Sequence, residues 1–203
     1  PLFRELQQEV RETQKANTPV TVQEIQYYFT VCGLKQNEGR AEEAAQQYIE
    51  VEKNNARVQM MNFHLGEYYF RQEKFTDAVR QYEGANIANL SNREIADMKF
   101  HQGYSYFALQ RFELAKPMFS SIRSMKDDPN YIDANYYYGF LAFRDRQYGE
   151  ALEAFRIVEN EKQYGTVVPY YIAQIYYIQG RKDEAVGRFN QIMAKNPKSP
   201  VPY

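Results

Sequence analysis

A pattern of one small residue, one alanine and one aromatic residue recurs five times along this chain. The small residues are spaced 34, 37, 36 and 34 positions apart; each alanine follows 12 positions later, and each aromatic residue four positions after its alanine. The small residues are Cys32, Gly66, Gly103, Gly139 and Ala173; the alanines are Ala44, Ala78, Ala115, Ala151 and Ala185; the aromatic residues are Tyr48, Tyr82, Phe119, Phe155 and Phe189. A period near 34 residues with a constant internal offset predicts an array of stacked helical hairpins.

Between these markers, the apolar residues follow the period of a helix, as Leu65 and Tyr69 do at i and i+4. Short polar turns separate the two arms of each hairpin, and short connections force neighbouring helices to run antiparallel. We therefore predict an all-α fold, a right-handed α-solenoid of antiparallel helix pairs. Residues 22–198 form its five tandem repeats, with hairpins at roughly 22–54, 56–89, 92–126, 130–162 and 166–196 and turns at 36–39, 72–74, 110–111, 145–147 and 179–182.

Local signals refine the helix ends. The segments 21–24 and 91–94 match the capping box, in which a hydroxyl and a carboxylate satisfy amide donors of the first turn. Asp128 before Pro129 predicts a capping acid followed by a proline at the first helical position. Pro117 lies inside a predicted second arm, where it removes a hydrogen bond, and predicts a kink or a late helix start.

Both ends of the chain extend beyond the five hairpins. Within residues 1–21, the segment 3–16 predicts an additional helix with Phe3, Leu6 and Val10 on one face. It is either a cap or the second arm of a truncated earlier repeat. Residues 199–203 repeat the pattern of residues 166–170, which predicts the start of a truncated sixth repeat.

Composition and motifs exclude several function classes. A net charge of −1 and a pI near 6.3 argue against a nucleic-acid surface, and no apolar stretch is long enough to span a bilayer. The single cysteine, Cys32, rules out an internal disulfide and is expected to be a buried, inert thiol. His64 and His101 form no recognisable metal-ligand spacing with it, and no phosphate loop or nucleophile elbow occurs. We expect no enzyme activity, no cofactor and no metal.

The five in-phase units resemble the tetratricopeptide repeat family over about 170 residues. In that family, the small residue lies in the first helix, and the alanine and aromatic residue lie in the second. By the resemblance, Gly66, Gly103 and Gly139 admit close approach of the arms with the alanines opposite them, while the aromatic residues fill the wedge between hairpins. Tyr28 matches the family's large early aromatic residue, but Asn62, Lys99, Asn135 and Pro169 do not.

The resemblance implies a superhelix whose first-arm helices line a concave face. Its groove-facing positions are unusually aromatic, which favours an interaction surface, although many of the rings could instead pack on neighbouring helices. The predicted partner-binding residues are Phe63, Glu67, Phe70, Phe100, Tyr104, Phe107, Tyr136, Phe140, Phe143, Tyr170 and Tyr177, with Gln174 in the fifth repeat and Phe29, Gly33 and Gln36 at the corresponding places in the first. The family's clamp for a terminal carboxylate lacks its basic residues here.

These observations predict a protein–protein interaction scaffold that binds a protein or peptide segment in an aromatic concave groove. Two alternatives stay open: a self-assembly module that associates through its terminal hairpins, and a recruiting domain of a larger enzyme or bacterial envelope complex. We expect no nucleic-acid partner and no membrane insertion. The composition, rich in tyrosine, glutamine and asparagine, resembles that of bacterial envelope-associated repeat proteins, while the cysteine count suits cytosol or periplasm equally.

Overall fold

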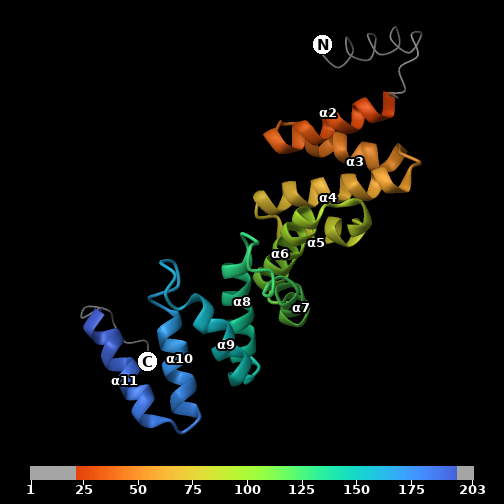
Figure 1. Ribbon diagram of the computed structural model, residues 1–203. Coiled ribbons are helices and arrows are strands. Elements are labelled where there is room, and N and C mark those ends of the chain that lie inside the picture. Colours follow the sequence, from red (N-terminus) through yellow and green to blue (C-terminus); the bar gives the residue numbers. More distant parts are fainter. Residues whose placement is uncertain (1–21, 196–203) are drawn as a thin grey trace. The chain divides into compact units, whose positions relative to one another are not determined.

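The computed structural model describes residues 22–195 (Figure 1). The predicted N-terminal helix, the capping box at Thr21 and the predicted start of a sixth repeat lie outside the described residues. Within these residues, every regular element is helical, and α2–α3, α4–α5, α8–α9 and α10–α11 form the packed pairs of helical hairpins. The chain divides into two compact units, residues 1–109 and residues 110–203.

The first unit contains two complete hairpins and one further α-helix. Its described helices are α2 (Val22–Gln36), α3 (Ala41–Val51), α4 (Asn55–Arg71), α5 (Phe75–Gly84), the 3-10 turn η2 (Ile87–Asn89) and α6 (Asn92–Ala108). The second unit begins with one α-helix and continues with two complete hairpins. Its described helices are α7 (Phe112–Ile122), α8 (Tyr131–Arg144), α9 (Tyr148–Val158), α10 (Val168–Ile178) and α11 (Lys182–Lys195).

Glycine at the small-residue position of the repeat leaves room for an aromatic ring of the second arm. A Cβ atom added at Gly66 would lie 2.7 Å from the ring of Tyr82, and one added at Gly139 would lie 2.9 Å from the ring of Phe155. The nearest side chain to each of these glycine positions is therefore the repeat's aromatic residue. Tyr82 and Phe155 are both buried, so the ring fills a notch that only glycine leaves open.

In the second unit, the repeat's aromatic residue on each second arm also packs against the first arm of the next hairpin. Phe119 of α7 stacks on Tyr137 of α8, with ring centroids 5.2 Å apart and planes 18° from parallel. Phe155 of α9 stacks on Tyr171 of α10 at 5.2 Å and 9°. Offset stacking of this kind adds to the energy of simple burial.

The first hairpin differs from the others because its turn, residues 37–40, is one residue longer than the three-residue turns that follow. The extra residue shifts α2 by one position relative to the later first arms. Val31 is buried where the later repeats place their small residue, and Cys32 is exposed. Tyr27 is buried, whereas Tyr28 is 65% exposed. The predictions of a buried Cys32 thiol and of Tyr28 as the early core aromatic are therefore wrong.

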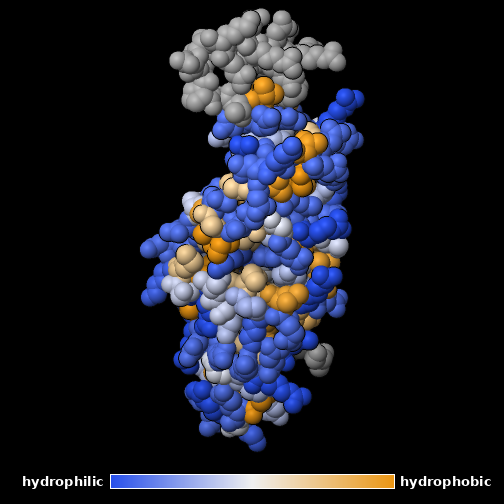
Figure 2. Space-filling model, turned by 90° about the vertical axis from the view of Figure 1, so that its right-hand side faces the viewer, coloured by the Kyte–Doolittle hydropathy of each residue, from blue (hydrophilic) through white to orange (hydrophobic). Residues whose placement is uncertain are grey.

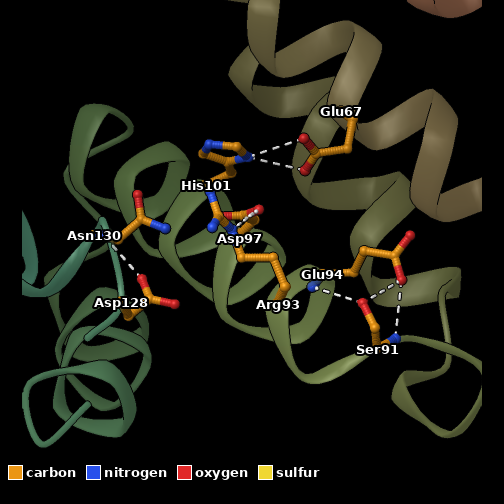
Figure 3. Close-up of polar contacts among 8 residues, drawn as sticks. All are labelled: Glu67, Ser91, Arg93, Glu94, Asp97, His101, Asp128 and Asn130. Atoms are coloured by element: carbon orange, nitrogen blue, oxygen red, sulfur yellow. Dashed lines mark hydrogen bonds and ion pairs between the residues drawn. The ribbon is translucent and has the colours of Figure 1, made fainter. Parts of the chain in front are cut away.

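The helix-end predictions had mixed outcomes. The capping box at Ser91 and Glu94 is present: the Ser91 hydroxyl accepts from the Glu94 amide, and the Glu94 carboxylate accepts from the Ser91 amide at 2.9 Å (Figure 3). The cap predicted at Asp128 is wrong, because α8 begins at Tyr131 and the Asp128 carboxylate accepts from the amide of Asn130 at 2.8 Å. The late start predicted at Pro117 is also wrong, because α7 begins at Phe112 and continues past that proline.

A buried carboxylate joins the first two hairpins. Glu52 accepts hydrogen bonds from the Tyr48 hydroxyl at 2.7 Å, the Asn54 amide at 2.7 Å and the Arg57 guanidinium at 2.8 Å. The bonds from Arg57 lower the pKa of Glu52 to about 2, although burial opposes this. The carboxylate thus stays charged at neutral pH and fixes the start of α4 against the end of α3.

Filling the notch at the glycine with a larger side chain tests this packing. We expect Gly139→Leu to lower the free energy of unfolding by about 1–3 kcal/mol or more, because the new side chain meets the buried ring of Phe155. Gly187→Leu is the matched control, since nothing lies within 4 Å of the Cβ position in α11. Urea unfolding followed by circular dichroism measures both. Equal destabilisation of the two variants would contradict the notch.

Candidate functional site

In the first unit, the predicted groove residues fall into two groups. Phe63 and Phe100 are buried, at 5% and 8% exposure, so the prediction that they offer exposed rings to a partner is wrong. Phe70, Tyr104 and Phe107 are half-buried and keep part of each ring at the surface. The first-arm helices α4 and α6 therefore present fewer rings than the repeat pattern predicted.

A ring cluster joins the second hairpin to α6. His101 stacks on Phe70 with centroids 4.0 Å apart and planes 20° from parallel, and Tyr104 meets Phe70 edge-on at 5.9 Å. Phe75, at the start of α5, lies 5.7 Å from Tyr104. The predicted partner-binding set contains neither His101 nor Phe75. Both rings take part in the packing of this surface.

Glu67 binds the polar edge of the same cluster. Its carboxylate accepts a hydrogen bond from the Tyr82 hydroxyl at 2.8 Å and lies 2.9 and 3.1 Å from Nδ1 of His101, as Figure 3 shows for the histidine. Glu67 thus connects the notch ring of its own hairpin to the next first arm. We assign this predicted groove residue a positioning role within the chain.

A small pocket lies between α2, α4 and α6. His64, at its wall, places Nε2 3.1 Å from the Tyr27 hydroxyl. Burial, followed by the charge of Lys35, lowers the pKa of His64 to about 4, so the ring is neutral at physiological pH. The pocket is lined by Lys35, Phe63, His64, Glu67, Arg71 and Glu94.

In the second unit, Tyr171 is the centre of the aromatic surface. Besides stacking on Phe155, its ring lies 5.2 Å from Phe143 and 6.0 Å from Phe140, both in edge-on contacts. Phe140, Phe143 and Tyr171 are all half-buried. The predicted set contains Tyr170 and lacks Tyr171. The sequence does carry a signal for Tyr171, because the position directly after the chosen residue has a ring in four repeats, at His64, His101, Tyr137 and Tyr171.

A second ring pair borders this surface. Tyr136 of α8 stacks on Tyr164 with centroids 4.0 Å apart, and the Tyr164 hydroxyl donates to Asp133 at 2.7 Å. The loop after α9 is thereby held against α8. Tyr170 is half-buried, and its hydroxyl is enclosed without a hydrogen-bond partner. Burial raises the pKa of Tyr136 and, more strongly, that of Tyr164, where the hydrogen bond to Asp133 adds to the effect.

The last described hairpin carries the most exposed ring of the predicted set. Tyr177 is 65% exposed and the adjacent Ile178 is 50% exposed. Together with Gln174 and Phe189 they line a shallow apolar pocket between α10 and α11. At the other end of the chain, the one-residue shift of α2 buries Gly33, so its prediction as a groove residue is wrong. Phe29 and Gln36 remain exposed.

Features of other site classes are sparse in the described part of the chain. Residues 22–195 hold no group of three or more histidine, cysteine or acidic side chains placed to bind a metal. Over the same span, no helix combines the length and the apolar character needed to cross a membrane. On the face drawn in Figure 2, hydrophobic residues form several small patches separated by hydrophilic ones. The half-buried rings on the first arms form the candidate surface.

These hairpins are similar to repeats in known protein families and solved structures. Models of the tetratricopeptide repeat match residues 34–92, 100–164 and 170–199. No curated protein sequence matches the chain. Among solved structures, MamA AMB-1 aligns over 88% of this chain and 94% of its own, with 20% identity and a TM-score of 0.65. YrrB, titled a TPR protein with an unusual peptide-binding site, aligns over 85% and 86%, with 20% identity and a TM-score of 0.65. These similarities show a shared fold.

The neutral state of His64 predicts a pH dependence. Its folded pKa, about 4, lies below the ordinary value of 6.5, so the unfolded chain binds a proton that the folded chain excludes between these values. Stability from this group is therefore lost as the pH falls from 6.5 towards 4. We expect His64→Gln, which can still bond to Tyr27, to lose less stability than the wild type between pH 7 and pH 5. Urea midpoints measure this, and identical losses would contradict it.

Proposed function

Because the chain belongs to the tetratricopeptide repeat family, we propose that it holds a segment of a partner protein against the aromatic faces of its first-arm helices. Repeats of this family are typically protein–protein interaction modules. They are not catalytic, so residues 34–199, the span of the matches, are a scaffold and not an enzyme. The proposal concerns where the partner binds and what chemistry it carries.

The observation that carries the proposal is the half-buried ring surface of the second unit. Phe140 and Phe143 both contact Tyr171, and all three residues are half-buried. Charge is nearly absent from these first arms: α10 has no charged residue, and α8 has only Asp133 and Arg144. A surface of exposed rings without charges gains most from a partner that covers it with apolar or aromatic side chains.

This chemistry defines the partner segment. An acidic or basic segment would lose its hydration on α10 without gaining a charge of opposite sign there. An apolar or aromatic segment loses nothing comparable and buries the remaining ring area. YrrB, which shares the fold, is titled as having a peptide-binding site, which agrees with a peptide segment as the partner. We therefore propose a segment with apolar or aromatic anchors, either extended or helical.

A peptide selection tests this proposal. The chain is used as bait for a random peptide library, and the selected peptides are titrated against the wild type and Phe140→Ser. We expect the selected sequences to be enriched in aromatic and aliphatic residues. Because ring hot spots contribute about 2 kcal/mol or more, Phe140→Ser should weaken their binding by at least roughly tenfold.

The matched control is Phe112→Ser. Phe112 is also half-buried and belongs to the same unit, but it lies on the second arm α7, where its ring contacts Arg144. Both variants are first checked for helical content by circular dichroism. Selected peptides that bind the two variants equally well, or that are mainly charged, would contradict the proposed surface.

A further inference from the structure

The last two described helices, α10 and α11, lie side by side (Figure 1) and form a shallow apolar pocket between them. The volume of this pocket is about 370 Å³, and its lining consists of Gln174, Tyr177 and Ile178 from α10 and Phe189 from α11. None of these four side chains is charged, and Tyr177 and Ile178 are both exposed. The pocket therefore gains most from an occupant that is itself an apolar side chain.

The pocket and the ring surface of the second unit share one face of α10. Tyr171, Gln174 and Ile178 follow the helical spacing i, i+3 and i+7, so their side chains lie along the same face. Tyr171 belongs to the ring surface through its contacts with Phe140 and Phe143. Because a helix rises about 1.5 Å per residue, Ile178 lies about 10 Å from Tyr171 along the axis. The two apolar sites are thus about 10 Å apart, with Gln174 between them.

The side chain of Gln174 determines which backbone conformation fits between these sites. It is half-buried, and no group within residues 22–195 forms a hydrogen bond with its amide. This amide offers two N–H donors and one oxygen acceptor. An extended segment can bond to both, because its own backbone N–H and C=O groups are not paired internally. A helical occupant pairs those groups within itself and would cover the amide without bonding to it, which is unfavourable.

The separation of the two apolar sites determines the spacing of the anchors on the partner. In a polyproline II segment, each residue advances about 3.1 Å and every third side chain points the same way, so anchors at i and i+3 are about 9 Å apart. In a β-strand, side chains on one face are about 7 or 13 Å apart, which fits less well. Resting on the proposed function, we infer that the partner segment lies along α10 in a polyproline II conformation. Its apolar anchors at i and i+3 occupy the ring surface and the pocket, and its backbone bonds to Gln174.

Two synthetic peptides with the same anchors test the conformation. The first has two phenylalanines separated by two prolines, which exclude a helix. The second has its two phenylalanines seven residues apart in an alanine-rich sequence, which also places them about 10 Å apart once the peptide is helical. Titration calorimetry measures their binding to the whole chain, and circular dichroism checks that the second peptide is helical. We expect the proline-containing peptide to bind at least roughly tenfold more tightly, because only its backbone can bond to Gln174 and its anchors need no folding.

Three variants, each checked for helical content, locate the proline-containing peptide on α10. Gln174→Leu keeps the size of the side chain and should weaken binding about fivefold, the effect of one hydrogen bond. Ile178→Asp places a charge at the pocket and should weaken binding at least roughly tenfold. Val186→Asp is its matched control, because Val186 is an exposed apolar residue of α11 that does not line the pocket.

Several outcomes would overturn the inference. They are binding of neither peptide, which would mean that residues outside 22–195 or a second copy cover the pocket, equal or tighter binding of the helical peptide, full affinity in Gln174→Leu, and equal effects of the two aspartates. The proposed function is tested separately by Phe140→Ser. If the helical peptide binds more tightly and Phe140→Ser weakens its binding, the ring surface still binds a partner and only the inferred conformation is wrong.

Discussion

The contact between a second-arm ring and a first-arm glycine is the constraint on which the rest of the structure depends. Tyr82 over Gly66 and Phe155 over Gly139 bring the two arms closer than any side chain at the glycine would allow. The pattern makes each hairpin a unit whose second arm presents one large ring at a fixed place. Repeats in such arrays gain stability mainly from their neighbours, so the position of that ring also determines where the next hairpin binds.

The candidate surface follows from this arrangement. In the second unit, Phe155 fills the notch and also stacks on Tyr171, which in turn contacts Phe140 and Phe143. The rings of successive first arms are thereby held side by side at partial exposure. In the first unit, a hydrogen-bonded version of the same connection runs from Tyr82 through Glu67 to His101. The second unit therefore offers an apolar contact surface, and the first offers one with charged neighbours.

The sequence predicted the all-helical repeat fold because period, turn length and capping residues act locally. It predicted individual exposures less well because these depend on single-residue shifts. One extra turn residue before Ala41 rotates α2 by about 100°, which exchanges the environments of Val31 and Cys32. Likewise, Tyr170 and Tyr171 are adjacent in the chain, and only the packing of α10 on α9 decides which ring meets Phe155. Phe63 and Phe100 are buried by neighbouring helices that the repeat pattern does not specify.

The most direct test of this account is a double-mutant cycle between Phe155 and Tyr171, using Phe155→Leu, Tyr171→Leu and the double variant. The free energies of unfolding are measured in urea for all four proteins. If the notch ring positions the next hairpin by stacking, the two substitutions should be coupled by about 0.5–1.5 kcal/mol. Additive effects would contradict the account, because each ring would then stabilise its own hairpin without positioning its neighbour.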